Sequence, residues 1–218
     1  MNSLVVDSVE LSFGGRSILS NVYLKCEPGD VIGLLGRNGS GKSSLLKIIF
    51  GALKGTHQSV RYNGKYTEQL YRLKQAIHFV PQEGLFMNYL TLEDLVKIFR
   101  LESCIDYHTI LSELRASRTE KIGNLSGGMK KFIEVLTILY TEGSYVLLDE
   151  PFSYLSPVLV EKLIPHIKKQ SEKKGIILTD HQYEWVWSVA NKHYVLYEGS
   201  LKAIYESDEL ERFGYLAK

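Results

Sequence analysis

The stretch Gly36-Arg37-Asn38-Gly39-Ser40-Gly41-Lys42-Ser43 decides the fold of this chain. It follows the apolar run 31–35 and precedes the apolar stretch 44–50, which predicts a strand, a glycine-rich turn and a helix. In that setting G-x-x-x-x-G-K-[ST] is the pattern of a phosphate-binding loop. Glycines let backbone N–H groups close around phosphate oxygens, and the helix start adds donors and a positive dipole end. We therefore expect Lys42 to reach the outer phosphates of a nucleotide and Ser43 to offer its hydroxyl to Mg²⁺.

The bulk composition describes an ordinary globular chain of 218 residues, long enough for one sizeable core and a small subdomain. A net charge of +1 gives no reason to expect a nucleic-acid partner. Cys26 and Cys104 lie far apart and in no metal-ligand spacing, which favours a reduced, cytosolic protein. We find no secretory leader and no apolar stretch long enough to span a bilayer, so a membrane role requires a partner.

The first part of the chain predicts an antiparallel β region ahead of the loop. Residues 4–12 and 18–26 alternate in polarity, and the turn 14–16 between them is rich in glycine. Phe13 lies at the end of the first predicted strand. On its own it fits two roles equally well: stacking on an adenine ring, or ordinary packing in the hairpin.

The middle of the chain predicts a helical insertion. A short strand over 76–80 ends at Pro81-Gln82, and from residue 84 to about 123 the pattern is helical. Thr91 and Asp94 form a capping-box pattern ahead of 95–101, and 107–115 is a second amphipathic stretch. We interpret 84–123 as a helical subdomain inserted between two parts of an α/β core, 1–83 and 124–218.

The last part of the chain predicts a second helix start and two buried strands that end in polar side chains. Ser126-Gly127-Gly128 opens a helix to about Tyr140; alone, it would be a simple N-cap. The apolar strand 145–148 ends in Asp149-Glu150, and 175–179 is followed by Asp180-His181. Because ligands bind at the carboxyl ends of parallel strands, we expect Asp149 to hold Mg²⁺ and Glu150 to orient or deprotonate a water.

These motifs together resemble the ATP-binding cassette (ABC) ATPases over nearly the whole length of the chain. The resemblance implies an α/β P-loop NTPase core with an N-terminal antiparallel β region and an inserted helical subdomain, all within one domain over 1–218. It assigns catalysis to Lys42, Gln82, Glu150 and His181, and Mg²⁺ to Ser43, Gln82 and Asp149. It assigns ATP binding to Phe13, Gly36, Arg37, Asn38, Gly39, Ser40, Gly41, Lys42, Ser43, Ser44, Ser126, Gly127 and Gly128.

The resemblance also implies partners. In this family the serine-glycine signature, here 126–128, caps the γ-phosphate of ATP bound to the opposite subunit of a head-to-tail dimer. We therefore expect a second ABC subunit, forming a homodimer, and separate transmembrane permease subunits that hold the chain at the inner face of the cell membrane. Three residues depart from the family pattern: Met129 for Gln or Glu, Tyr154 for Gly, and Ser156 for Asp.

Three functions remain open at this point. The first is the ATPase subunit of a membrane transporter, with lipopolysaccharide export as the subtype suggested by the strings 149–152 and 179–182. The second is an ABC-type ATPase acting on ribosomes or DNA, although the sequence has neither a second cassette nor a long coiled coil. The third is a binding-only regulatory cassette, which Met129 and Ser156 would favour and which Lys42, Glu150 and His181 oppose.

Overall fold

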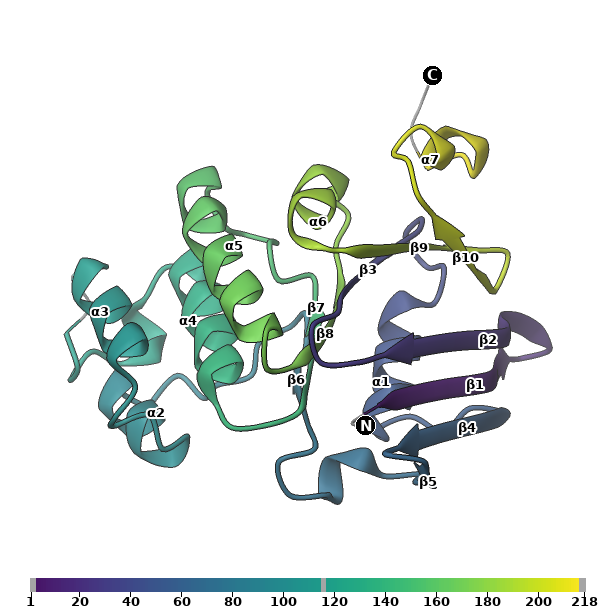
Figure 1. Cartoon of the computed structure of the whole chain (residues 1–218). Helices are drawn as coiled ribbons and strands as arrows, with labels where there is room; N and C mark the ends of the chain where they lie inside the picture. The colour runs from purple at the N-terminus through teal and green to yellow at the C-terminus, as the bar shows by residue number, and fades with distance from the viewer. Residues whose placement is uncertain (1–2, 115–116, 216–218) are drawn as a thin grey trace.

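A six-stranded mixed sheet forms the centre of the protein (Figure 1). The computed structural model describes residues 3–114 and 117–215. The strand order is β10-β9-β3-β8-β7-β6, and neighbours are parallel except for the β9–β10 hairpin. The bounds are β3 (Val31–Leu35), β6 (Ile77–Val80), β7 (Tyr145–Asp149), β8 (Gly175–Thr179), β9 (Lys192–Tyr197) and β10 (Ser200–Ile204).

Both faces of this sheet are covered, so its central strands β3, β7 and β8 are buried at every position. Successive side chains of a strand point to opposite faces. In β3, Ile32 and Leu34 therefore join one hydrophobic core, while Val31 and Leu35 join the other. This explains why the sequence of the central strands is continuously apolar rather than alternating.

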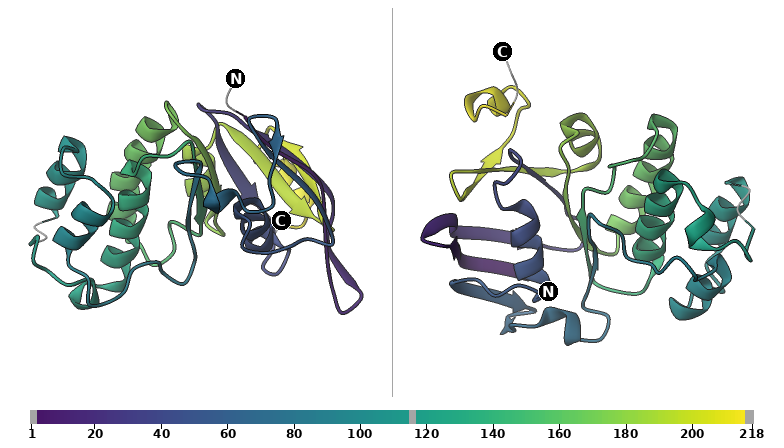
Figure 2. Two further views of the ribbon diagram at one scale, coloured as in Figure 1. Left: turned by 90° about the horizontal axis from the view of Figure 1, so that it is seen from below. Right: turned by 180° about the vertical axis from the view of Figure 1, so that it is seen from behind.

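One face of the mixed sheet is covered by α1 (Lys42–Phe50) and the antiparallel sheet (Figures 1 and 2). The antiparallel sheet has the order β2-β1-β4-β5 and consists of β1 (Leu4–Phe13), β2 (Arg16–Cys26), β4 (His57–Tyr62) and β5 (Lys65–Tyr66). Gly14 and Gly15 both have positive φ, as a tight hairpin turn between β1 and β2 requires. The buried side of α1 packs in the same core as strands of both sheets.

The opposite face is covered by helices, and the two helices of the insertion lie farthest from the antiparallel sheet (Figure 2). The helices are α2 (Leu92–Ile98), α3 (Ile105–Glu113), α4 (Gly127–Tyr140), α5 (Pro157–Ser171), α6 (Tyr183–Val189) and α7 (Glu209–Arg212). Two single 3₁₀ turns, Leu70–Arg72 and Ile122–Asn124, complete the described elements.

The predicted α/β fold class, with an antiparallel sheet ahead of a parallel core, is confirmed. The capping box at Thr91 and Asp94 is also present, but α2 begins at Leu92, immediately after its cap, and ends before residue 101. The second amphipathic stretch, predicted over 107–115, is α3, which ends at Glu113; residue 115 lies outside the described residues. In the described part of 84–123 the only strand-like pairing is a single bridge between Thr91 and Lys121.

Candidate active site

The phosphate-loop stretch 36–43 connects β3 to α1, as its sequence predicts. The Lys42 ammonium donates to the carbonyl oxygens of Gly36 at 2.6 Å and Arg37 at 3.2 Å, so the loop closes around it. Burial lowers the pKa of Lys42, while the carboxylates of Glu150 and Asp149 raise it. The Ser40 hydroxyl is buried and has no hydrogen-bond partner among the described residues. An unpaired buried hydroxyl beside a lysine at a helix start fits an anionic ligand such as a phosphate chain.

Asp149, the last residue of β7, contacts the start of α1. Its Oδ1 accepts hydrogen bonds from the Ser43 hydroxyl at 3.0 Å and the Thr179 hydroxyl at 2.8 Å. Mg²⁺ prefers oxygen ligands and is bound by one or two protein groups together with phosphate oxygens. The described residues contain no cluster of three or more His, Cys, Asp or Glu side chains suited to a metal. The Ser43 hydroxyl and the Asp149 carboxylate, 3.0 Å apart, are oxygen donors of the kind that fits Mg²⁺ bound together with a nucleotide.

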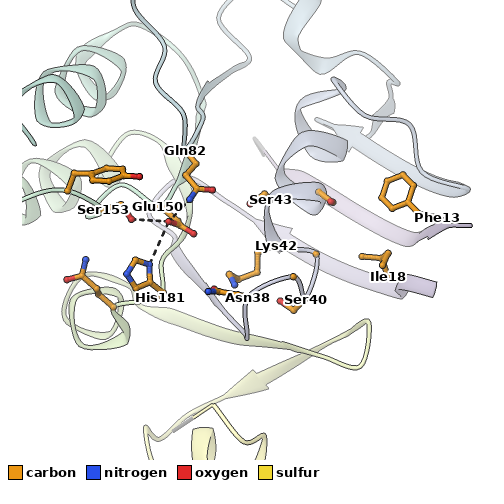
Figure 3. Close-up of a pocket in the computed structure, with 15 residues that line it drawn as sticks. Phe13, Ile18, Asn38, Ser40, Lys42, Ser43, Gln82, Glu150, Ser153 and His181 are labelled. Atoms are coloured by element: carbon orange, nitrogen blue, oxygen red, sulfur yellow. Dashed lines mark hydrogen bonds and ion pairs between the residues drawn. The ribbon is translucent and has the colours of Figure 1, made fainter. Parts of the chain in front are cut away.

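Two donors converge on one oxygen of Glu150, and the ring of His181 lies beside it (Figure 3). Glu150 Oε2 accepts from Gln82 Nε2 at 3.0 Å and from the Ser153 hydroxyl at 2.9 Å, and His181 Nδ1 lies 3.7 Å away. The backbone of Glu150 is left-handed, with φ of 50°, and its N–H donates to the Thr179 carbonyl at 2.9 Å. A non-glycine residue in this region is strained, and such strain is concentrated at functional sites.

These groups line one open cavity of about 770 Å³. Phe13 and Ile18 lie on the far side of the loop from Glu150 and His181, with Lys42 between them (Figure 3). The predicted site residues that line this cavity are Phe13, Asn38, Gly39, Ser40, Gly41, Lys42, Ser43, Ser44, Gln82, Glu150 and His181. Gly36 and Arg37 line an adjoining cavity instead, together with His181 and Asn38. One cavity thus holds cationic, hydroxyl and carboxylate groups beside an exposed aromatic ring.

The signature residues 126–128 do not line this cavity. Ser126 caps α4 through a hydrogen bond that its Oγ accepts from Met129 N, at 3.3 Å, and Ser126 and Gly127 are exposed. Gly128 is required by a close approach: a Cβ at this position would lie 2.6 Å from the carbonyl oxygen of Tyr154. Within one chain, therefore, the start of α4 and the phosphate loop do not meet at a single site.

The site contains functional neighbours that the sequence did not identify. Ser153, three residues after Glu150, is a direct donor to its carboxylate. Asp180 is fully buried and accepts from Phe152 N at 2.9 Å and Gln182 N at 3.0 Å, which ties the loops after β7 and β8 together. Burial raises the pKa of Asp180, and these two backbone donors oppose that rise. Asp180 could have been noticed because it follows β8 directly; Ser153 has no comparable sequence signal.

Comparison with known proteins identifies the family. The model of the family described as "ABC transporter" matches residues 19–153. The chain belongs to this family of ATP-binding cassette ATPases. It is 26% identical to the ABC transporter ATP-binding protein YtrB of Bacillus subtilis, over 90% of this chain and 70% of that protein. It is 25% identical to the lipopolysaccharide export system ATP-binding protein LptB of Haemophilus influenzae, over 93% of this chain and 90% of that protein.

Solved structures show the same fold. An ATP-binding subunit of an ABC transporter superposes with a TM-score of 0.80 at 22% identity, covering 97% of this chain and 93% of that one. A bacterial Atm1-family ABC exporter with ATP bound superposes with a TM-score of 0.83 at 19% identity. That match covers 97% of this chain but only 40% of the exporter chain. Among the described helices of the ABC ATPase, none is long and apolar enough to cross a membrane.

Proposed function

We propose that this ABC ATPase hydrolyses ATP and thereby energises a separate transmembrane permease. The observation that carries the proposal is the position of Glu150 Oε2. This oxygen accepts hydrogen bonds from Gln82 and Ser153, and Glu150 lines the same cavity as Lys42 and Ser43. A carboxylate held in this way can orient a water and accept its proton while the neighbouring lysine binds the phosphate chain.

Each site residue has one task in this proposal. Lys42 exchanges its bonds to the loop carbonyls for phosphate oxygens, and Phe13 stacks on the adenine ring. Bound Mg²⁺ would supply charge neutralisation at the phosphate oxygens, and Ser43, Asp149 and Gln82 are the residues that would hold it. His181, beside Glu150, donates a hydrogen bond to the outermost phosphate.

We further propose that two copies associate head to tail, so that 126–128 of one copy completes the nucleotide site of the other. The exposure of Ser126 and Gly127, and their absence from the cavity of their own chain, support this arrangement. The exposed N–H groups at the start of α4 suit a phosphate. ATP would then close the pair, and hydrolysis would let it open.

The domain boundaries and location belong to the same proposal. Residues 1–218 form one ABC ATPase domain with 84–123 as its helical subdomain; α2 and α3 lie in this segment and pack against the core that contains α4. The chain is cytoplasmic and reaches the inner face of the membrane through its permease. The likeness to LptB supports lipopolysaccharide export as the subtype.

The first test is phosphate release by the purified chain. We expect Glu150→Gln to keep ATP binding but to lower the turnover rate by about 10² to 10⁴, the range supplied by a general base. Lys42→Ala should lose binding and turnover together because it removes the ammonium around which the loop closes. Glu161→Gln, an exposed glutamate on α5, is the matched control and should behave as the wild-type chain.

The outcomes distinguish the alternatives. Glu150→Gln that hydrolyses ATP at the wild-type rate would contradict the role of Glu150, and a wild-type chain that binds ATP without turnover would favour a regulatory cassette. Light scattering tests the dimer: Glu150→Gln with ATP should double in mass, and Lys42→Ala should not. Affinity purification from solubilised membranes should recover a multi-span permease; ribosomal or chromosomal material would overturn the transporter.

A further inference from the structure

A buried lysine on α4 holds the backbone of the catalytic segments, although the proposed mechanism does not use it. Lys131 is 4% exposed. Its ammonium donates to the carbonyl oxygens of Pro81 at 2.8 Å, Asp149 at 3.2 Å and Gln82 at 3.4 Å. These three carbonyls lie at the ends of β6 and β7, directly beside the side chains of Gln82 and Glu150.

A second charged group on the same face of α4 holds the other end of the segment that carries Gln82. Glu134, three residues after Lys131, is also 4% exposed. Its Oε1 accepts hydrogen bonds from Leu85 N at 2.8 Å and Phe86 N at 3.2 Å. Gly84, between the two anchored ends, has φ of +97° and lies beside the same carboxylate.

All five contacts go to backbone atoms, so they fix the path of the chain whatever the side chains along it are. A buried ammonium or carboxylate is costly unless hydrogen bonds compensate it, and here backbone carbonyls and amides supply them. Burial lowers the pKa of Lys131, and the carboxylates of Glu134, Asp149, Asp180 and Glu150 oppose this. Removal of Lys131 would free the carbonyls of Pro81, Gln82 and Asp149 together.

We propose that Lys131 is a positioning residue which, with Glu134, fixes the backbone of 81–86 and of Asp149 so that Gln82 and Glu150 meet. The proposal rests on the ATPase activity proposed above. It also assigns α4 a second task. The helix whose first residues 126–128 face outward for a second copy is the helix that holds Gln82 and Glu150, so a displacement of α4 moves the catalytic pair.

The test compares two buried lysines that make the same kind of contact. Lys174 is 6% exposed and donates to the carbonyl oxygens of Leu139 and Thr141, away from the cavity. Both Lys131→Met and Lys174→Met should lower the thermal midpoint. Only Lys131→Met should lower kcat, by about tenfold or more with KM for ATP within about twofold, the signature of an interaction lost in the transition state.

A double-mutant cycle tests the route of the effect. Because Lys131 acts by bringing Gln82 and Glu150 together, Lys131→Met should lower kcat by a much smaller factor in a Gln82→Ala background than in the wild-type chain. An undiminished effect in that background, or equal kcat for Lys131→Met and Lys174→Met, would overturn the proposal. If Lys131→Met fails to fold, Glu134→Leu replaces it, because leucine cannot accept the hydrogen bonds of Leu85 N and Phe86 N. A lowered kcat at unchanged KM supports the proposal, and an unchanged kcat overturns it.

Hydrogen exchange separates this inference from the ATPase proposal. In the nucleotide-free chain, Lys131→Met should speed exchange of the amides in 82–86 relative to Lys174→Met, whether or not the wild-type chain hydrolyses ATP. Unchanged exchange there would overturn the positioning role by itself. If exchange is faster but the wild-type chain does not hydrolyse ATP, the role of Lys131 in fixing the backbone is supported, and only the proposed ATPase function is contradicted.

Discussion

At the scale of single residues, the carboxylate of Glu150 is the centre of the site because two donors share one of its oxygens. Its side chain is 17% exposed, so water reaches it, yet Gln82 and Ser153 both donate to Oε2. A hydrogen bond to a charged group contributes about 1.5–3 kcal/mol when it is buried and less when water can replace it. The shared oxygen therefore limits the rotation of the carboxylate.

The Ser153 hydroxyl should have a measurable but modest effect on turnover. We expect Ser153→Ala to lower kcat on the order of fivefold, corresponding to about 1 kcal/mol, because Gln82 still holds the carboxylate. KM for ATP should not change, since Ser153 orients Glu150 rather than the phosphate chain. Steady-state phosphate release measures both constants. A raised KM at unchanged kcat would contradict this role.

At the scale of elements, two of the described α-helices begin with a side-chain cap. Ser126 caps α4, and α2 begins with a complete capping box: Thr91 Oγ1 accepts from Asp94 N at 3.1 Å, and Asp94 Oδ2 accepts from Thr91 N at 2.8 Å. The Thr91 hydroxyl also donates to Asp94 Oδ2, at 2.7 Å, so the backbone N–H and the hydroxyl of Thr91 both stabilise the charged carboxylate and lower the pKa of Asp94. A seven-residue helix depends strongly on such a cap because it has few internal hydrogen bonds.

Thr91→Ala should therefore destabilise the protein without affecting the chemistry. We expect a loss of about 1 kcal/mol in the free energy of unfolding, the usual cost of replacing a threonine cap by alanine. Urea denaturation followed by circular dichroism measures this loss, and Thr119→Ala, in the exposed loop after α3, is the control. The kcat of Thr91→Ala should equal that of the wild-type chain; a large fall in kcat would mean that α2 contributes to the site.

At the scale of the whole molecule, the mixed sheet separates two hydrophobic cores, and the helical core contains the buried Tyr107 and the partly buried Tyr140 and Tyr215. Tyr107 is fully buried, and its hydroxyl lies 2.8 Å from that of Thr137. Burial raises the pKa of Tyr107, Tyr140 and Tyr215 to about 12 in each case. Tyr215 also donates to the His181 carbonyl at 3.1 Å, so the chain just after α7 contacts the catalytic edge.

These tyrosines should make the fold sensitive to alkali. The unfolded chain loses phenol protons near pH 10, whereas the folded chain keeps these three until about pH 12, so stability is lost as the pH rises through this interval. Tyr107→Phe should reduce that loss by roughly 1–3 kcal/mol at the upper end of the interval. Denaturation at several pH values measures the difference. An identical pH dependence in both chains would show that Tyr107 titrates normally.

The sequence by itself determined the features that depend on neighbouring residues. The glycine-lysine pattern at 36–43 and the apolar runs of β3, β7 and β8 identified the α/β core, because a loop motif and a short apolar run are both local features of the sequence. Asp149 and Glu150 could be expected near the phosphate loop because parallel strands bring their carboxyl ends to one edge of a sheet. Gln82 was expected there only from the resemblance to the ABC ATPases. The bounds of α2 were less accurate: the sequence located the capping box but placed the helix after Asp94, whereas α2 begins at Leu92, directly after Thr91.

Only the tertiary structure decided which atoms meet. Gln82 and Glu150 are 68 residues apart, and the carbonyls bound by Lys131 come from 50, 49 and 18 residues away, so no local pattern predicts that they touch. A lysine in the helix after the signature looks like an ordinary surface residue in sequence. It is buried here because packing of α4 against the ends of β6 and β7 excludes water, and the backbone carbonyls there then need a donor.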